Sequence, residues 1–440
     1  MNPTRRSRLR TPLAFFAATL ISALPIAAGH AADAELKVKD NDVWVFAGDS
    51  ITAQRQHTNY IEAYFRTRYP QMHLHFRNSG IGGNRTGHVL KRFDYDVAAW
   101  KPTIVSVELG MNDVYGPEAD YIKGMKEIIA KIRAIPAQPV LISSSPVNDG
   151  SVMGNWKSDR CEKLHPYTEA LKKLAAEEKV VFVDQFHVLL PLWGKNRQDG
   201  EAAATKEGKW PPPATPAPAA PAPGATPAPA KPAPLPPSLI NLEGDTVHPG
   251  ATGQYTMAAT ILAGLKAEGE VSAVTLKADG KVVEAKRCKI TDVTAKDGKL
   301  SFTRLDEVSP WPILPAAKNA AKLLPDMLKL SQYQLRVTGL AEGDYRVTIN
   351  GKPAGTVSAK DLAAGWNMTS AFGGALGERS TAILGLVGKL QAGLNNNWRA
   401  ASQANDATKL AEAQKAIEEC EAEIQKAVQP IPLQIEIAKQ

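Results

Sequence analysis

The residues from 43 to 184 alternate between strand-like and helix-like patterns, and this alternation limits the fold more than any other feature of the sequence. Short apolar runs that are typical of strands alternate with segments whose apolar residues recur every three or four positions, as in helices. Near-continuous apolar strands separated by helices indicate a parallel sheet that is buried on both faces. We therefore predict an α/β domain, with strands at 43–47, 73–78, 104–109, 140–143 and 180–184 and helices around 60–65, 122–132 and 164–174.

The first 31 residues are typical of a signal peptide. Four arginines precede an apolar stretch over residues 12–28, and small residues follow at Ala31 and Ala32. We predict Sec-type export to the periplasm or the medium, since the apolar run is short for a membrane anchor, the alternative interpretation. No membrane span is predicted in the mature chain. Without the leader the net charge falls from +7 to +3, which gives no support to nucleic-acid binding.

The sequence predicts no cofactor and no metal. It has no H-E-x-x-H pattern, no paired C-x-x-C and no phosphate-binding P-loop. The three cysteines, Cys161, Cys288 and Cys420, are odd in number and far apart, so no particular disulfide is predicted.

A proline- and alanine-rich tract interrupts the first domain. Residues 211–237 hold 13 of the 32 prolines, a composition that favours polyproline II and cannot form a core. The α/β unit still needs the residues from Asp245 onward and the helix after them. We therefore place the first domain at 42–266 and interpret about 195–238 as an insertion within it, not as a linker between domains.

The second half of the chain changes to a period of two. Tyr333, Leu335 and Val337 alternate with polar residues, and Asn350-Gly351 predicts a hairpin turn. We predict a β-meander within a small β-rich, sandwich-like module over 271–370. Two helices with apolar stripes should then close the chain as a helical hairpin over 375–430. Whether these helices pack on the module or mediate self-association is open, and so is the oligomeric state.

Two short blocks in the first half of the α/β domain contain candidate catalytic groups. Gly48-Asp49-Ser50-Ile51 directly follows the first strand, so Ser50 is either a nucleophile at the edge of the sheet or merely the cap of the next helix. Asn78-Ser79-Gly80-Ile81-Gly82-Gly83-Asn84 is rich in glycine. Its backbone can point an N–H at a substrate, or it is an ordinary turn.

Two further blocks lie later in the domain. In Gly110-Met111-Asn112-Asp113, the Asn112 amide can donate to an oxyanion, or it forms an Asx-turn. In Asp245-Thr246-Val247-His248-Pro249, a carboxylate three residues before a histidine can fix the tautomer of the ring. A surface turn is the alternative there, and Pro249 is predicted to begin the following helix.

In this order the four blocks resemble the SGNH hydrolase superfamily, also called GDSL esterases and lipases, over about residues 42–266. The resemblance implies a three-layer α/β/α fold with a mainly parallel, flavodoxin-like sheet of five strands. It implies Ser50 as nucleophile, His248 as general base and then acid, and Asp245 as the carboxylate that orients it. It also implies an oxyanion hole formed by the Ser50 and Gly83 backbone N–H groups and the Asn112 side chain, with Gly82 as the competing second donor.

The resemblance implies a serine esterase with an acyl-enzyme intermediate. For an exported chain we expect short acyl groups, such as acetyl, on a small-molecule or polysaccharide ester, with the β-rich module positioning a polysaccharide. A lipid acylhydrolase or lysophospholipase, an acyltransferase on the same site and a non-catalytic exported binding protein are the alternatives. No G-x-S-x-G occurs, which argues against an α/β-hydrolase nucleophile elbow.

Overall fold

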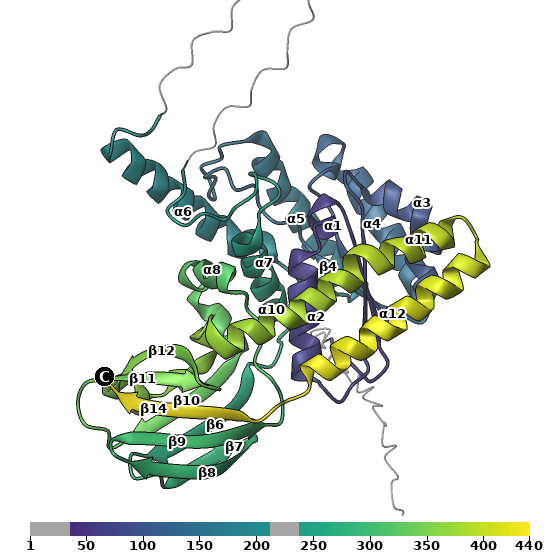
Figure 1. The fold of residues 1–440 in the computed structure, drawn as a ribbon. Coiled ribbons are helices and arrows are strands. Elements are labelled where there is room, and N and C mark those ends of the chain that lie inside the picture. The colour runs from purple at the N-terminus through teal and green to yellow at the C-terminus, as the bar shows by residue number, and fades with distance from the viewer. Residues whose placement is uncertain (1–35, 212–236) are drawn as a thin grey trace, which may run out of the picture. The chain divides into compact units, whose positions relative to one another are not determined.

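Five parallel strands form the sheet that carries the candidate site (Figure 1). The structure is a computed structural model, and it describes residues 36–211 and 237–440. All neighbouring strands pair in parallel, and every residue of the central β3 is buried, as the continuous apolar pattern predicts. In spatial order the strands are β2 (His75–Gly80), β1 (Val43–Gly48), β3 (Ile104–Glu108), β4 (Gln138–Ile142) and β5 (Val181–Val183). The predicted α/β fold is confirmed.

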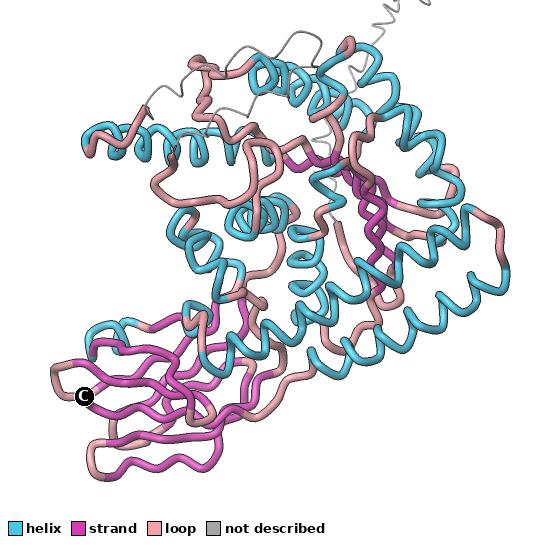
Figure 2. The backbone as a smooth tube through the Cα atoms, turned by 45° about the horizontal axis from the view of Figure 1, so that its top comes forward, coloured by secondary structure: helices cyan, strands magenta, loops and turns pink. Residues whose placement is uncertain are grey.

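Helices cover this sheet in two groups (Figure 2). One group consists of α3, α4 and α5, and the other pairs α2 with α7. In α4, Met125, Ile128 and Ile132 recur at helical spacing and are fully buried, which explains why this segment packs as a helix. The helices of this domain are α1 (Ser50–Ala53), α2 (Gln56–Arg68), α3 (Thr86–Asp96), α4 (Glu118–Arg133), α5 (Asp159–Glu178), α6 (Gln185–Lys206) and α7 (Ala251–Gly264).

The insertion differs from its predicted bounds at its N-terminal side. Helix α6 continues to Lys206, although the insertion was predicted to begin at about 195. Gly200 lies against the backbone of Ser238, and the Leu239 N–H donates to the Asn196 carbonyl at 3.0 Å, so the chain returns to α6 after the tract. The polar composition of residues 195–206 is the reason why the sequence did not predict this part of α6. The predicted signal peptide over 1–31 and most of the proline-rich tract lie outside the described residues.

The β-rich module consists of two sheets that share one core. The predicted meander is wrong, because β10 pairs in parallel with β6 while β11 lies in the other sheet. Both strands turn their alternate apolar residues inward, so they contribute to one core from two sheets. The hairpin at Asn350-Gly351 is confirmed between β11 and β12, with positive φ at both residues. The sheets contain, in spatial order, β13 (Trp366–Asn367), β10 (Gln332–Thr338), β6 (Glu270–Lys277) and β7 (Val282–Lys286), and then β12 (Lys352–Ser358), β11 (Asp344–Ile349), β14 (Leu433–Lys439), β9 (Lys299–Asp306) and β8 (Cys288–Lys296).

The C-terminal helices pair with each other as predicted, but they do not close the chain (Figure 1). Strand β14 follows them and inserts between β11 and β9, burying Leu433, Ile435 and Ile437. The apolar stripes of the helices pack mainly into the core of the α/β domain, where Trp398 stacks on Trp100 with ring centroids 3.4 Å apart. The helices are α10 (Gly374–Lys389), a π-helical turn (Leu390–Leu394), α11 (Asn395–Gln403) and α12 (Ala407–Val428). The short helix α8 (Lys318–Leu323) packs against α7, whereas α9 (Ala359–Ala364) packs against β10 and β12 of the module.

Cys161, Cys288 and Cys420 are all free thiols. None of the helices within 36–211 and 237–440 is long and apolar enough to cross a membrane.

A buried ionic cluster fastens α12 to the α/β domain. Glu421 of α12 accepts hydrogen bonds from Arg77 at 2.7 Å and Arg66 at 3.4 Å, and its other oxygen lies 2.7 Å from His75 Nδ1. Burial alone would raise the pKa of Glu421, but Arg77, His75 and Arg66 lower it to about 2. The carboxylate is therefore charged, and it compensates the buried Arg77, while Arg66 has a second and closer partner in Glu62 at 2.8 Å.

We expect Glu421→Gln to lower the free energy of unfolding by about 3 kcal/mol, because the buried Arg77 loses its counter-charge, while Arg66 keeps its ion pair with Glu62. Urea unfolding at pH 7 measures this difference. Because the pKa of Glu421 is lowered by folding, the wild-type advantage is present above pH ~4.5 and is lost as the pH falls toward 2. Glu423→Gln is the matched control on the same helix, since Glu423 is 56% exposed and should cost less than about 0.5 kcal/mol. Equal losses in the two variants would contradict the role of the cluster.

Candidate active site

Ser50 and His248 meet at the carboxyl end of β1, although 198 residues separate them. The Ser50 Oγ lies 2.7 Å from His248 Nε2. Ser50 is the first residue of α1, but Asp49 is the cap of that helix, accepting a hydrogen bond from the Ile51 N–H at 2.9 Å. The alternative that Ser50 only caps the helix is therefore wrong, and its hydroxyl faces the imidazole.

Asp245 lies behind the ring of His248. Its Oδ2 is 3.0 Å from His248 Nδ1, and its Oδ1 accepts the backbone N–H groups of Val247 and His248 at 2.7 Å each. Partial burial would raise the pKa of Asp245, but these donors and the imidazole hold it below its usual value. A charged Asp245 keeps the proton on Nδ1, which leaves Nε2 free to accept a proton from Ser50.

The helix after His248 begins later than predicted. Gly250 is the N-cap of α7 and Ala251 its first residue, so Pro249 does not begin the helix. The carbonyl of Pro249 instead accepts long hydrogen bonds from the side chains of Gln54 and Gln254, both at 3.3 Å. These contacts hold the loop of His248 beside α1.

The glycine-rich turn lies against the end of β1, where the Ile81 N–H donates to the Gly48 carbonyl at 3.2 Å. Among the residues that the structure describes, no acceptor faces the N–H of Ser50, Gly82 or Gly83. Gly83 has φ +72, a conformation that side chains disfavour, and the space beside both glycines is open. Gly82 and Gly83 therefore offer equally free N–H groups, and both predicted second oxyanion donors have the same capacity to donate.

The Asn112 side chain points toward the same group of residues. Its Nδ2 donates to the Asn84 carbonyl at 3.1 Å and to Asp49 Oδ2 at 3.4 Å. Asn112 precedes a short 3-10 helix but makes no side-chain cap bond there, so it does not form the alternative Asx-turn. The structure thus brings together Ser50, Asp245, His248 and Asn112 at one edge of the sheet.

The sequence that contains these blocks matches a known family. The family model described as the GDSL-like lipase/acylhydrolase family matches residues 46–254. Residues 46–254 belong to this family. The GDSL domain places the chain in the SGNH hydrolase superfamily and among the carboxylic ester hydrolases.

Two further comparisons extend the match. The acetylxylan esterase of Geobacillus stearothermophilus is 24% identical to this chain in an alignment 172 residues long, which covers 34% of this chain and 78% of the relative. A solved structure of a gut microbial diltiazem-metabolizing enzyme matches with a TM-score of 0.71 and 20% identity, covering 93% of this chain and 100% of its own. The GDSL domain, the β-rich module and the C-terminal helices therefore recur together as one fold.

A buried polar network beneath Ser50 was missed by the sequence analysis. His57 Nδ1 lies 2.6 Å from Gln254 Oε1, and His57 Nε2 forms an ion pair with Glu108 Oε2 at 3.0 Å. Burial alone would lower the pKa of His57, but Glu108 and Gln254 raise it above its usual value. Glu108 is the last residue of β3, a strand that is otherwise mostly apolar. A carboxylate in such a strand is a sequence sign of a buried polar site.

Asp49 lies between this network and the candidate site, since its Oδ2 accepts from Asn112 and its charge interacts with Glu108 and His57. Its side chain is buried, and burial together with the neighbouring Glu108 raises the pKa of Asp49 to about 7. Asp49 thus binds a proton in the folded protein at a pH where an exposed aspartate has lost it.

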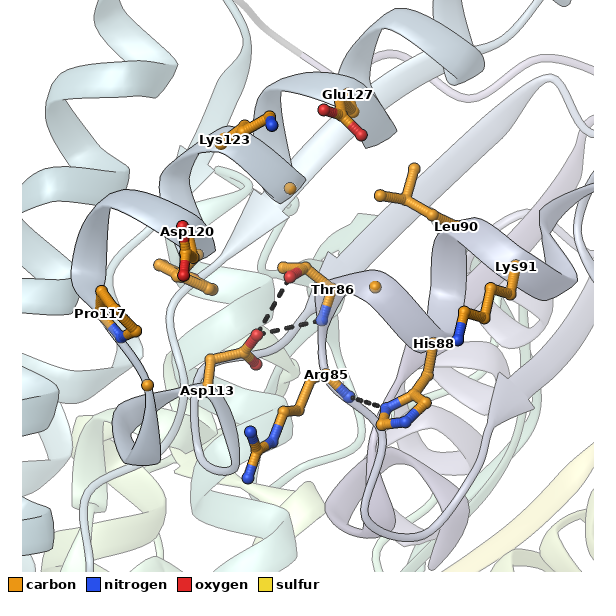
Figure 3. Close-up of a pocket in the computed structure, with 14 residues that line it drawn as sticks. Arg85, Thr86, His88, Leu90, Lys91, Asp113, Pro117, Asp120, Lys123 and Glu127 are labelled. Atoms are coloured by element: carbon orange, nitrogen blue, oxygen red, sulfur yellow. Dashed lines mark hydrogen bonds between the residues drawn. The ribbon is translucent and has the colours of Figure 1, made fainter.

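A cavity of about 490 Å³ lies beside the site between α3 and α4 (Figure 3). Its wall includes Arg85 and Asp113, the residues that directly follow Asn84 and Asn112. Asp113 accepts from the backbone N–H of Thr86 at 3.0 Å and from its hydroxyl at 3.1 Å, so it anchors the start of α3. Asp113 therefore has a positioning role, and the cavity does not include Ser50 or His248.

We expect Asp49→Asn to change how stability depends on pH. A carboxyl whose pKa is raised by folding stabilises the protein below about pH 4 and loses this contribution as the pH rises through 7. The free energy of unfolding of the wild type should therefore fall relative to the variant by up to about 1.4 kcal/mol per pH unit over this range. Asparagine keeps the acceptor for the Ile51 N–H.

Urea unfolding between pH 4 and pH 8 measures this difference. Asp94→Asn is the control, because Asp94 is 85% exposed and should show no such dependence. Parallel pH profiles for the wild type and Asp49→Asn would contradict the raised pKa.

Proposed function

We propose that this chain is a serine esterase in which Ser50, His248 and Asp245 act together. The single observation that carries the proposal is the 2.7 Å contact between Ser50 Oγ and His248 Nε2, with Asp245 at 3.0 Å behind the ring. His248 takes the proton as the Ser50 oxygen attacks the ester carbonyl, and then gives it to the leaving alcohol. Water, activated by the same imidazole, then releases the acid from the acyl-enzyme.

We propose that the Ser50 and Gly83 N–H groups and the Asn112 amide hold the tetrahedral oxyanion. The two N–H groups have no acceptor among the described residues, so they break no protein hydrogen bond when they donate to the developing negative charge. Asn112 would exchange its 3.4 Å contact with Asp49 for the oxyanion and keep the shorter one to Asn84, which fixes its orientation.

As substrate we propose a short acyl ester, acetyl above all, on a carbohydrate. The similarity to an acetylxylan esterase supports this choice. The signal-peptide pattern supports export to the periplasm or the medium, where such polysaccharides are met. We further propose that catalysis resides in residues 42–266 and that the β-rich module over 271–370 helps to position the polymer.

We expect Ser50→Ala to abolish hydrolysis of p-nitrophenyl acetate and of acetylated xylan, with a loss in kcat of at least about 10³-fold, because no other nucleophile replaces the hydroxyl. Ser301→Ala in β9 is the control and should keep full activity. An unchanged rate in Ser50→Ala would contradict the proposal. If the wild type hydrolyses no ester with an acyl chain of two to twelve carbons, a binding protein is favoured. If it transfers the acyl group to an added sugar, an acyltransferase is favoured.

We expect Asn112→Ala to lower kcat by roughly a hundredfold or more, since one oxyanion donor is lost in the transition state. KM should change much less, because the donor acts on charge that is absent from the bound ester. Steady-state kinetics on p-nitrophenyl acetate measures both values. Asn396→Ala in α11 is the control, and near-normal turnover in Asn112→Ala would remove this residue from the oxyanion hole.

A further inference from the structure

Two histidines and a glutamate converge at a place that the proposed mechanism does not use. His165 and Glu169 lie one turn apart on α5, and His187 lies in the first turn of α6. His165 Nδ1 is 3.0 Å from His187 Nε2, and Glu169 Oε1 is 3.7 Å from the same nitrogen. One donor atom from each residue lies within 4.8 Å of the others.

A fourth residue fixes the orientation of His187. Asp184 Oδ2 lies 2.8 Å from His187 Nδ1, while Asp184 Oδ1 accepts the His187 backbone N–H at 3.0 Å. The carboxylate keeps the proton on Nδ1, so the lone pair of Nε2 points toward His165 and Glu169. A carboxylate behind a histidine in this way is the usual second layer of a metal site, where it sets the tautomer and increases the basicity of the ligand.

The ring of His165 is also held in place. It stacks between Trp156 and Phe186, with ring centroids 6.0 and 6.5 Å away. Both imidazoles are therefore oriented by other groups before any ligand binds. Such pre-organisation reduces the entropy that binding would cost.

We propose that His165, Glu169 and His187 bind a divalent transition-metal ion of the zinc type. Bonds of about 2.0–2.2 Å in a tetrahedral zinc site separate neighbouring ligand atoms by about 3.4 Å. The two separations at His187 Nε2, 3.0 and 3.7 Å, lie on either side of this value. Glu169 is half exposed, so water can reach the site as the fourth ligand. A set of two imidazoles and one carboxylate suits zinc better than magnesium or calcium, which prefer oxygen ligands.

The ion would join α5 to the start of α6. An ion that binds only the folded state stabilises it by mass action, so the site would strengthen the helix that leads into the proline-rich insertion. The sequence predicts no metal because these ligands follow the pattern H-x3-E-x17-H across two helices, which no short metal-binding motif contains.

The test is isothermal titration of the untagged mature chain with Zn²⁺ after removal of metals by a chelator. We expect one equivalent to bind and a rise in the melting temperature, with no binding of Mg²⁺ under the same conditions. His187→Gln and Glu169→Gln should lose this equivalent. His73→Gln is the matched control, since its side chain is 63% exposed and lies outside the cluster. The titration is repeated with His248→Gln, because zinc that binds at His248 in the wild type is then absent and can be told apart from zinc at the cluster.

Asp184→Asn provides a sharper variant. Asparagine still caps α6, so folding is preserved, but it no longer holds His187 as a carboxylate does. We expect zinc affinity to fall by on the order of 10- to 100-fold. Circular dichroism and the melting temperature in chelator, which should match the wild type, exclude misfolding. The proposal is overturned if the wild type binds no zinc, if Glu169→Gln and His187→Gln bind it as tightly as the wild type, or if magnesium binds equally well.

Discussion

The geometry of the candidate site depends on one buried amide, that of Gln254. Its Oε1 lies 3.1 Å from the backbone nitrogen and 2.6 Å from Nδ1 of His57, and its Nε2 donates to Gln54 and to the Pro249 carbonyl. The amide thus uses both its acceptor sites and both its N–H groups. Gln254 lies on α7 just after His248, whereas Gln54 and His57 lie just after Ser50. One side chain therefore aligns the two halves of the site, which are distant in sequence.

The last strand of the chain gives the β-rich module its closed core. Strand β14 occupies the middle of the five-stranded sheet. The segment 271–370 therefore lacks one strand of the module. The C-terminal helices lie between the two parts of the module in sequence and pack mainly on the α/β domain. The buried Glu421 then fixes α12 against Arg66 and Arg77. The C-terminal helices therefore join the α/β domain, on which they pack, to the β-rich module, whose sheet β14 completes.

The sequence predicted those parts of the fold that local patterns encode. The continuous apolar strands predicted the parallel sheet, and Asn350-Gly351 predicted a turn whose positive φ values the structure contains. Strand pairing in the module was predicted wrongly, because the alternation in β10 and β11 shows which side chains face inward but not which strand lies beside which. Strand β14 was overlooked, although Leu433, Ile435 and Ile437 carry the same alternation.

The sequence by itself predicted the residues of the candidate site, since Ser50, Asn112, Asp245 and His248 follow recognisable strand ends and short-range spacings. Only the tertiary structure decided which polar groups surround them. The Glu108–His57 pair, the raised pKa of Asp49 and the convergence of His165 with His187 all join residues from different elements. A hydrogen bond or a pKa shift depends on distances of a few ångströms and on burial. Both are set by how helices and strands pack, and no local pattern in the chain records them.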